Sequence, residues 1–279
     1  MFKFKIPLPF LITLAALSVL TPGILKGDDD PDRKKRETGI YYKNDLGYSW
    51  GVLSDQRMSN LHYEGPGGVL NFGRLAYRYY YITEISFARL QYNYSRPKHQ
   101  NTIVENPGAG VRFMHLRRIR TPGNYDFYMG AQANVFGNAR IAQRLGNSFL
   151  FADMIGELRP QADIFLSRRF LWRDWNVEFS MAASLAGYTL RIPEYGVSFE
   201  LDQDGGVKIQ GFESNFLLPH NYNHITTGVF IRESFPGKSN PNWFKIGYIW
   251  DYYSMNGDHN LNMHNTLHQF VLELYFKIR

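Results

Sequence analysis

Three residues that could form a hydrolytic site lie close together in the stretch SNLHYEGPGG, which runs from Ser59 to Gly68. Ser59 could act as a nucleophile, His62 as its general base and Glu64 as the group that orients the base. Such a site needs defined distances between the side chains, and spacing along the chain does not supply them. We therefore favour a loop with a Gly-Pro-Gly-Gly turn before the next strand, and no catalytic residue is predicted.

Two pairs of histidines have the i, i+4 spacing, namely His220 with His224 and His264 with His268. On a helix this spacing would place both imidazoles on one face, where they could bind the same metal ion. On a strand, four residues span about 13 Å, which is too far for one ion. Because the surrounding sequence favours strands, no metal site and no cofactor are predicted. The chain has no cysteine, which excludes disulfides, iron–sulfur clusters and thiol catalysis.

A larger set of charged residues falls on one face of the predicted strands and could line a polar interior. The predicted lining residues are Arg74, Arg78, Arg89, Arg159, Asp163, Arg169, Glu178, Lys245, Asp251 and Glu273. Basic groups outnumber acidic ones in this set, which favours a water-filled passage with a mild preference for anions. The alternative is a narrow interior filled by paired arginine and carboxylate side chains, with no open path.

The elements that would position these residues are strands with two unlike faces. Tyr125 to Val135 is the clearest, because apolar residues at odd positions alternate with mostly polar or small residues at even positions. Trp175–Thr189 and Trp243–Tyr252 repeat the pattern. Seven less regular segments complete a set of ten predicted strands: Ile40–Leu53, Val69–Tyr80, Glu84–Ser95, Gly108–Ile119, Glu157–Leu171, His224–Phe235 and Asn265–Arg279.

The connections between these strands alternate between short and long. The short ones are Ile82–Thr83, Thr121–Asn124, Trp172–Asp174 and Pro236–Pro241, and they contain turn residues or are only two residues long. The long ones are Ser54–Gly68, Arg96–Pro107, Phe136–Gly156, Leu190–Asn223 and Ser254–His264. Strict alternation of this kind is typical of a transmembrane antiparallel up-and-down β-barrel, with short periplasmic turns and long extracellular loops.

The aromatic residues support a barrel in a membrane. They make up 16% of the chain, with 19 tyrosines and 21 phenylalanines, and they gather near the ends of the predicted strands. Two aromatic belts around an apolar band are what the two membrane interfaces favour. A soluble β-sandwich with a tyrosine-rich core would not require this sorting. The aromatic residues predicted at the lipid interfaces are Trp50, Tyr79, Trp172, Trp175, Trp243 and Trp250.

A barrel of twelve strands is the alternative to ten. Segments 195–202 and 207–216 flank Gln203-Asp-Gly-Gly206, which is a good hairpin signal. If both segments crossed the membrane, Glu213 or Lys208 would face lipid, at a cost in free energy. We therefore predict that these segments form an extracellular hairpin inside a long loop.

The two ends of the chain fit this architecture. Residues 1–23 have two lysines followed by an apolar stretch, as in a signal peptide, although the cleavage site is uncertain. Residues 24–38 are charged and predicted to be a disordered periplasmic lead-in, so the barrel is expected over 39–279. No later run of 18 apolar residues occurs, so no transmembrane helix is predicted. The net charge of +6 is small and scattered, which does not support nucleic-acid binding.

The last segment, HQFVLELYFKIR from His268 to Arg279, is predicted to close the barrel beside the strand that starts near Ile40. Its apolar set should face lipid, while Glu273 and Lys277 should point inward. The signal-like start, the two-faced strands, the aromatic belts and this terminal strand together resemble bacterial outer-membrane β-barrel proteins as a class. Members of that class commonly end in an aromatic residue, whereas this chain runs on from Phe276 to Arg279.

The resemblance implies a location in the bacterial outer membrane, with outer-membrane lipids and the barrel-assembly machinery as partners. For function we expect a channel for small polar or anionic solutes. The alternative is a closed structural or surface-binding barrel that acts through its extracellular loops on an unidentified ligand. A lipid-modifying hydrolase is a third and less favoured hypothesis.

Overall fold

The structure is a computed structural model of the chain. It describes residues 38–56, 58, 61–97, 102–119, 125–142, 150–170, 173–191, 198–201, 207–210, 213–235, 241–256 and 262–278. Side chains are described in these ranges except at 168–170, 173–174, 198–201, 207–210 and 213. The predicted signal peptide, and all of the predicted lead-in except Thr38, lie outside the described residues. Among the described residues, no helix is long and apolar enough to cross a membrane.

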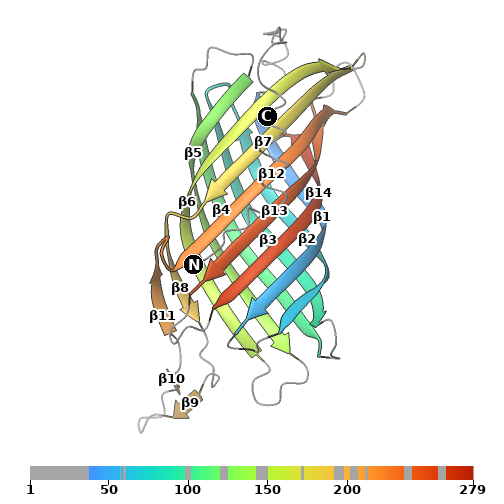
Figure 1. Cartoon of the computed structure of the whole chain (residues 1–279). Coiled ribbons are helices and arrows are strands. Elements are labelled where there is room, and N and C mark those ends of the chain that lie inside the picture. Colours follow the sequence, from blue (N-terminus) through green and yellow to red (C-terminus); the bar gives the residue numbers. More distant parts are fainter. Residues whose placement is uncertain are drawn as a thin grey trace, which may run out of the picture.

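Ten antiparallel strands form a closed ring, in the order β1-β2-β3-β4-β5-β6-β7-β12-β13-β14 (Figure 1). The bounds are β1 Gly39–Asp55, β2 His62–Tyr77, β3 Tyr81–Pro97, β4 Val104–Ile119, β5 Tyr125–Ala142, β6 Leu150–Phe170, β7 Arg173–Ala183, β12 Tyr222–Ser234, β13 Trp243–Met255 and β14 Met263–Lys277. This arrangement confirms the predicted ten-stranded antiparallel barrel.

The ring closes where the first strand pairs with the last. β1 and β14 are in continuous register from Tyr41 opposite Lys277 to Asp55 opposite Met263. Beyond the last strand, the backbone N–H of Ile278 donates to the carbonyl oxygen of Ile40 over 2.7 Å. The predicted pairing of the terminal segment is therefore confirmed. A closed ring leaves no unpaired sheet edge, as a lipid environment requires.

Alternation along each strand separates a polar interior from an apolar outer face. In β1, Lys43 and Asp45 point inward and are buried, whereas Tyr42 and Leu46 point outward and are exposed. β14 behaves in the same way, because Phe270 is 63% exposed and Glu273 is buried. Apolar side chains outside and charged side chains inside are the reverse of a soluble protein, and they are expected when the surrounding solvent is lipid.

The two ends of the barrel differ. We call the end where the chain enters at Gly39 and leaves after Lys277 the terminal end, and the opposite end the distal end. The distal connections are shorter than predicted, because several strands continue into the predicted loops. β2, for example, begins at His62, so the predicted Gly-Pro-Gly-Gly turn is wrong. Gly67 lies inside the strand, and a Cβ there would collide with the carbonyl oxygen of Tyr92 on β3.

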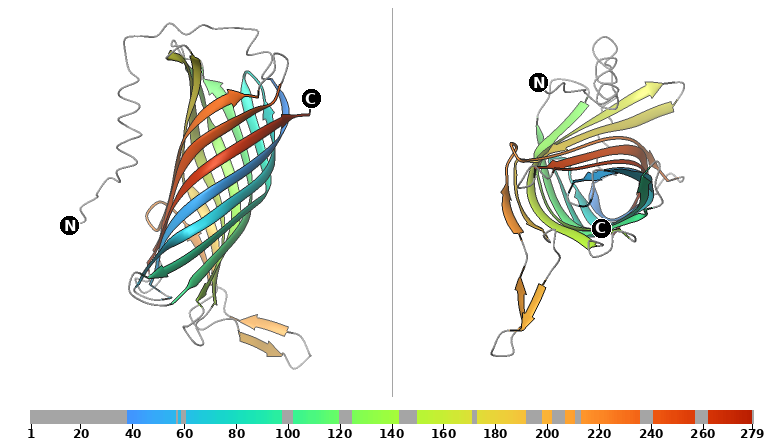
Figure 2. Two further views of the ribbon diagram at one scale, coloured as in Figure 1. Left: turned by 90° about the vertical axis from the view of Figure 1, so that its right-hand side faces the viewer. Right: turned by 60° about the horizontal axis from the view of Figure 1, so that its bottom comes forward.

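Four more strands lie at the distal end: β8 (Ala186–Arg191) and β11 (Glu213–Leu217), which extend the wall, and β9 (Ser198–Leu201) and β10 (Val207–Gln210), which do not. β6 has 21 residues and pairs with β7 over Gln161–Phe170 but with β8 over Asp153–Leu158. β8 then pairs with β11, while β9 and β10 form a separate hairpin that projects away from the barrel (Figure 2). The twelve-stranded alternative is therefore wrong, because these strands do not enter the closed ring.

The predicted single strand Trp175–Thr189 is also divided in the structure. β7 ends at Ala183, and the chain then changes neighbours. The N–H of Ser184 donates to His224 of β12, and the N–H of Leu185 donates to Leu158 of β6. The apolar alternation runs across this break, so periodicity alone does not reveal it.

Candidate functional site

A group of buried, apolar side chains lies in the interior near its distal end, and we call this group the distal cluster. It is drawn from strands on all sides of the ring and from the extension. Its members are Leu53, Met58, Tyr63, Val104, Ala142, Phe151, Ile155, Leu217, Tyr222, Tyr253, Met255 and Met263. Each is at most 7% exposed. Side chains packed in this way fill interior space at that level.

A second group, the terminal cluster, lies in the interior near the opposite end. Its members are Tyr41, Leu75, Ile82, Met114, Leu116, Tyr128, Trp243 and Tyr275. The rings of Trp243 and Tyr275 stack with centroids 3.4 Å apart, and Tyr41 meets Trp243 edge-on at 5.7 Å. The guanidinium of Arg232 lies over the Trp243 ring, 3.8 Å from its centroid. Stacked and edge-on rings fill space with little freedom to move aside.

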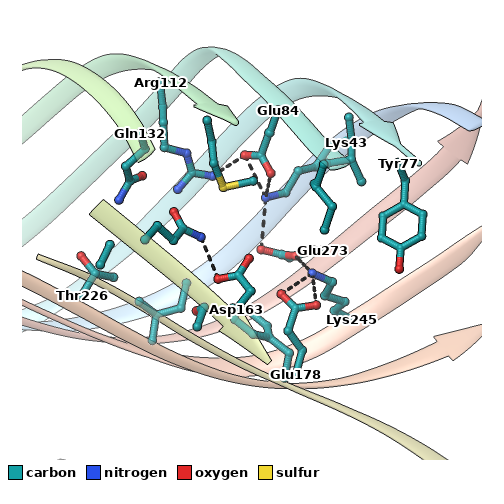
Figure 3. Close-up of a pocket in the computed structure, with 18 of the residues that line it drawn as sticks. Lys43, Tyr77, Glu84, Arg112, Gln132, Asp163, Glu178, Thr226, Lys245 and Glu273 are labelled. Carbon is teal, nitrogen blue, oxygen red and sulfur yellow. Dashed lines mark hydrogen bonds and ion pairs between the residues drawn. The ribbon is translucent and has the colours of Figure 1, made fainter. Parts of the chain in front are cut away.

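A network of ion pairs lies between the two clusters (Figure 3). The ammonium group of Lys43 lies 3.2–3.3 Å from carboxylate oxygens of three residues, Asp45, Glu84 and Glu273. Arg112 also pairs with Glu84. Lys245 lies 2.6 Å from Glu178 and 3.7 Å from Glu273, so Glu273 connects the two lysines. Buried charges of this kind are tolerated when each has partners.

A second polar group surrounds His224. Its Nδ1 atom lies 2.9 Å from Glu157, and its Nε2 atom lies 2.9 Å from Asp251. The hydroxyl of Tyr222 donates to Glu157 over 2.9 Å. Arg159 donates to the carbonyl oxygen of Ala182 over 3.2 Å and thereby links β6 to β7. His224 is 3% exposed, and its hydrogen bonds connect β6, β12 and β13.

A third polar group lies next to the distal cluster. Arg140 pairs with Asp55 at 3.1 Å and with Asp153 at 2.5 Å. Arg191, from β8, reaches the same Asp153 at 2.8 Å. Because Arg191 points into the barrel, β8 acts as part of the distal wall.

Two small cavities lie among the described residues of the interior. One cavity of about 100 Å³ lies beside Lys43, Glu84 and Asp163. Another of about 50 Å³ lies beside Arg89, His224 and Asp251. Cavities of this size hold a few water molecules. No group of three or more histidine and carboxylate side chains suited to a metal ion occurs in the described part of the chain.

Seven of the predicted lining residues lie inside the barrel: Arg89, Arg159, Asp163, Glu178, Lys245, Asp251 and Glu273. Arg74 and Arg78 do not, because both are exposed and Arg74 alternates with the inward Leu75. The prediction that Arg74 and Arg78 line the interior is therefore wrong. Near the terminal end the interior is apolar, and a long arginine on the outer face can reach the membrane surface. The side chain of Arg169 lies outside the described residues.

The aromatic residues predicted at the lipid interfaces also lie in different environments. Trp50 and Tyr79 are exposed on the outer face, and Trp175 is partly buried. Trp243 was wrongly predicted at the interface, because it shares the inward face of β13 with Lys245. Trp250 alternates with the inward Asp251 yet is only 6% exposed, and its ring stacks on Tyr252. Trp172 lies outside the described residues.

Sequence reasoning missed several residues of the interior, Lys43 and Glu84 above all. Lys43 could have been recognised from the sequence, because large apolar residues alternate with Lys43, Asp45 and Ser49. Glu84 was missed because β3 is irregular between Ser86 and Arg89, where its register with β4 shifts. An extra residue reverses the alternation, so Glu84 and Arg89 both point inward although one number is even and the other odd.

Two of the three residues considered for a hydrolytic site lie on the outside of the barrel. His62 and Glu64 are both exposed on the outer face of β2, and Ser59 lies outside the described residues. A G-x-S-x-G sequence, Gly47 to Gly51, went unnoticed in the sequence analysis. Its serine, Ser49, is fully buried within β1 and accepts a hydrogen bond from Asn93 over 3.2 Å. A nucleophile elbow requires a sharp turn between a strand and a helix, which is absent at this position.

No known family profile matches the sequence, and no curated protein does either. Several solved structures are similar in shape. The outer membrane protease OmpT from Escherichia coli has 8% sequence identity and a TM-score of 0.46, with 86% of this chain and 97% of that chain covered. The translocator domain of autotransporter NalP from Neisseria meningitidis has 8% identity and a TM-score of 0.41, with 95% and 94% covered. Likenesses of this strength say nothing about activity.

The strand pairing and the two faces of the wall assign the chain to a class. A closed antiparallel barrel with an apolar outer face and a polar interior is the architecture that spans the bacterial outer membrane. The chain is an outer-membrane β-barrel.

Proposed function

We propose that this barrel is closed to solutes and acts through the strands that extend from its distal end. The observation that carries the proposal is the order of layers in the interior. Apolar clusters lie at both ends, and paired charges lie between them. A polar solute would have to displace packed rings such as Trp243 and Tyr275 and then break ion pairs.

The charges of the interior do not support an anion passage. Buried acidic residues are at least as numerous as buried basic ones in the described part of the chain. Most of the basic groups already contact carboxylates, as Lys43 and Lys245 do. An anion-selective path requires an excess of available positive groups along its length. We therefore favour a closed barrel over the solute channel, and we assign it no enzymatic activity.

The distal extension supports a role in surface contact. β8 and β11 present large apolar residues on their outer side, since Tyr188 is 48% exposed and Phe216 is 61% exposed. This surface continues the outer face of the wall. The β9–β10 hairpin projects beyond it, as both views in Figure 2 show. Projections from a rigid scaffold are well placed for recognition.

Epitope insertion into intact cells tests this orientation. A short tag placed between β9 and β10, at Gly205, should be labelled by antibody on unbroken cells. A matched tag between β4 and β5, at Gly123, should be labelled only after the outer membrane is permeabilised, because short turns of such barrels face the periplasm. The reverse pattern of labelling would contradict the proposal.

A further inference from the structure

Three arginines and a histidine lie together on the outer face at the terminal end. Arg74 belongs to β2, Arg78 follows it, and His115 and Arg117 belong to β4. All four are exposed. We call these four residues the basic patch. Basic groups in this position face the surroundings of the barrel and play no part in the ion pairs of the interior.

Strand register brings the basic patch together across β3. Arg117 lies opposite Tyr81, and the backbone N–H of Arg78 donates to the carbonyl oxygen of that tyrosine over 2.9 Å. His115 lies opposite Thr83, and the two side chains form a hydrogen bond of 2.8 Å. Neighbouring strands are spaced by about 4.8 Å, so Arg78 and Arg117 lie on either side of one strand, about 10 Å apart at the backbone.

The arginines of the basic patch have no acidic partners among the residues that the structure describes. Arg74, Arg78 and Arg117 form no ion pair there, in contrast to two other arginines of β4. Arg112 pairs with Glu84, and Arg118 pairs with Asp126. Exposed guanidinium groups without a carboxylate are available to an external anion.

The basic patch also lies at the boundary between lipid tails and headgroups. Arg74 is opposite Ile85, which in turn is opposite Phe113, and both of these apolar residues are exposed. Toward the end of the barrel, Tyr80 and Tyr81 are exposed in the way that interface aromatics are. Among the described residues, the outer face of β13 and β14 has only apolar residues at this level, among them Ile246, Phe276 and Ile278. The basic patch therefore differs from this part of the outer face by its positive charge.

We propose that the basic patch binds the phosphate headgroup of an anionic glycerophospholipid in the leaflet around the terminal end. Arg78 and Arg117, which flank Tyr81, donate hydrogen bonds to the phosphate oxygens, since planar guanidinium groups match that geometry. The acyl chains run along Ile85 and Phe113. A zwitterionic lipid binds less well, because its own ammonium group opposes the arginines. The proposal requires only that the barrel lies in a membrane, so it does not depend on whether the interior conducts solutes.

Native mass spectrometry of the full chain, folded in a neutral detergent, tests the proposal. Phosphatidylglycerol and phosphatidylcholine with identical acyl chains are added separately. We expect phosphatidylglycerol to bind at least tenfold more tightly to the unchanged protein. The double variant Arg78→Gln/Arg117→Gln should lose this preference. The matched control is Arg96→Gln, on the outer face of β3 near the distal end, and it should retain the preference.

Two results would overturn the proposal. One is equal binding of the two lipids to the unchanged protein, and the other is an undiminished preference in the double variant. Folding of each variant is checked by the difference in gel migration before and after boiling. If the double variant does not fold, the single variant Arg117→Gln is measured in the same way and should reduce the preference. If inorganic phosphate alone displaces the lipid, the basic patch is a simple anion site. This result would also overturn the proposal that it binds a lipid.

Discussion

Lys43 is the centre of the ionic interior at the scale of single residues. It is 3% exposed and contacts three carboxylates that come from β1, β3 and β14. The strands that it joins include the pair that closes the ring. A buried ion network is costly to assemble but much more costly to leave incomplete, since an uncompensated charge then remains in a dry interior. Replacing Lys43 alone is therefore especially destabilising, because its three carboxylate partners remain buried without their counter-charge.

Replacing this lysine should destabilise the barrel strongly. We expect Lys43→Met to lower the free energy of unfolding by about 3–5 kcal/mol, because Asp45, Glu84 and Glu273 lose their common counter-charge. The measurement is urea unfolding of protein folded into lipid vesicles. Arg96→Met, on the exposed outer face, is the control and should change stability by about 0.5 kcal/mol or less. A similar small effect at both positions would show that Lys43 does not hold the network together.

The strands around Lys43 show how far the alternation of inward and outward side chains can be predicted from the sequence. Along β1 and β14 the inward and outward sets follow the odd and even positions without interruption, so Glu273 could be placed inside from the sequence. On β3 the irregularity between Ser86 and Arg89 reverses the sets, and no residue type in that stretch marks it. Charge alone was misleading for Arg74, because the membrane surface can satisfy an arginine as well as a polar interior can.

At the scale of elements, the close pairing of β2 with β3 depends on glycine. Gly67 points inward, and a Cβ there would collide with the carbonyl oxygen of Tyr92 and the side chain of Asn93. Gly68, its neighbour, would place a Cβ 3.6 Å from the nearest atom, which is ordinary contact. The Gly-Pro-Gly-Gly run thus permits close approach of two strands, whereas the sequence analysis interpreted it as a turn.

The two glycines should respond differently to the same substitution. We expect Gly67→Ala to cost about 1–3 kcal/mol of stability, because the two strands must move apart to accept the methyl group. Gly68→Ala should change stability by about 0.5 kcal/mol or less. Urea unfolding in vesicles measures both. Equal losses for the two variants would be inconsistent with the strand spacing described above.

The distal extension is the element that sequence patterns resolved least well. The hairpin signal around Gly205 was correctly interpreted as lying outside the barrel, yet β8 and β11 were not foreseen as a continuation of β6. The reason is physical. β6 is long enough to pair with two partners in succession, and this depends on contacts between strands that are far apart in the sequence. The alternation along 175–189 is the same whichever partner is present.

At the scale of the whole molecule, the outer face and the interior follow from one constraint. Lipid excludes unpaired backbone groups and exposed charges, so the sheet closes and turns its polar residues inward. Connection lengths and aromatic positions therefore sufficed to predict a ten-stranded barrel. The filling of the interior was left open by the sequence, because packing across the ring depends on side chains from opposite strands. Trp243, which stacks on Tyr275 of the neighbouring strand in the terminal cluster, was assigned to the lipid interface for this reason.

Conductance across a planar lipid bilayer tests the central claim most directly, since a closed interior and a channel differ in this property alone. The purified barrel is inserted at known density, confirmed by its change in gel migration on boiling, and voltage is applied in both directions in potassium chloride. Because both clusters and the ionic network obstruct the interior, we expect no stable conductance steps at either polarity. Reproducible steps that scale with salt concentration would contradict the closed barrel and restore the solute channel.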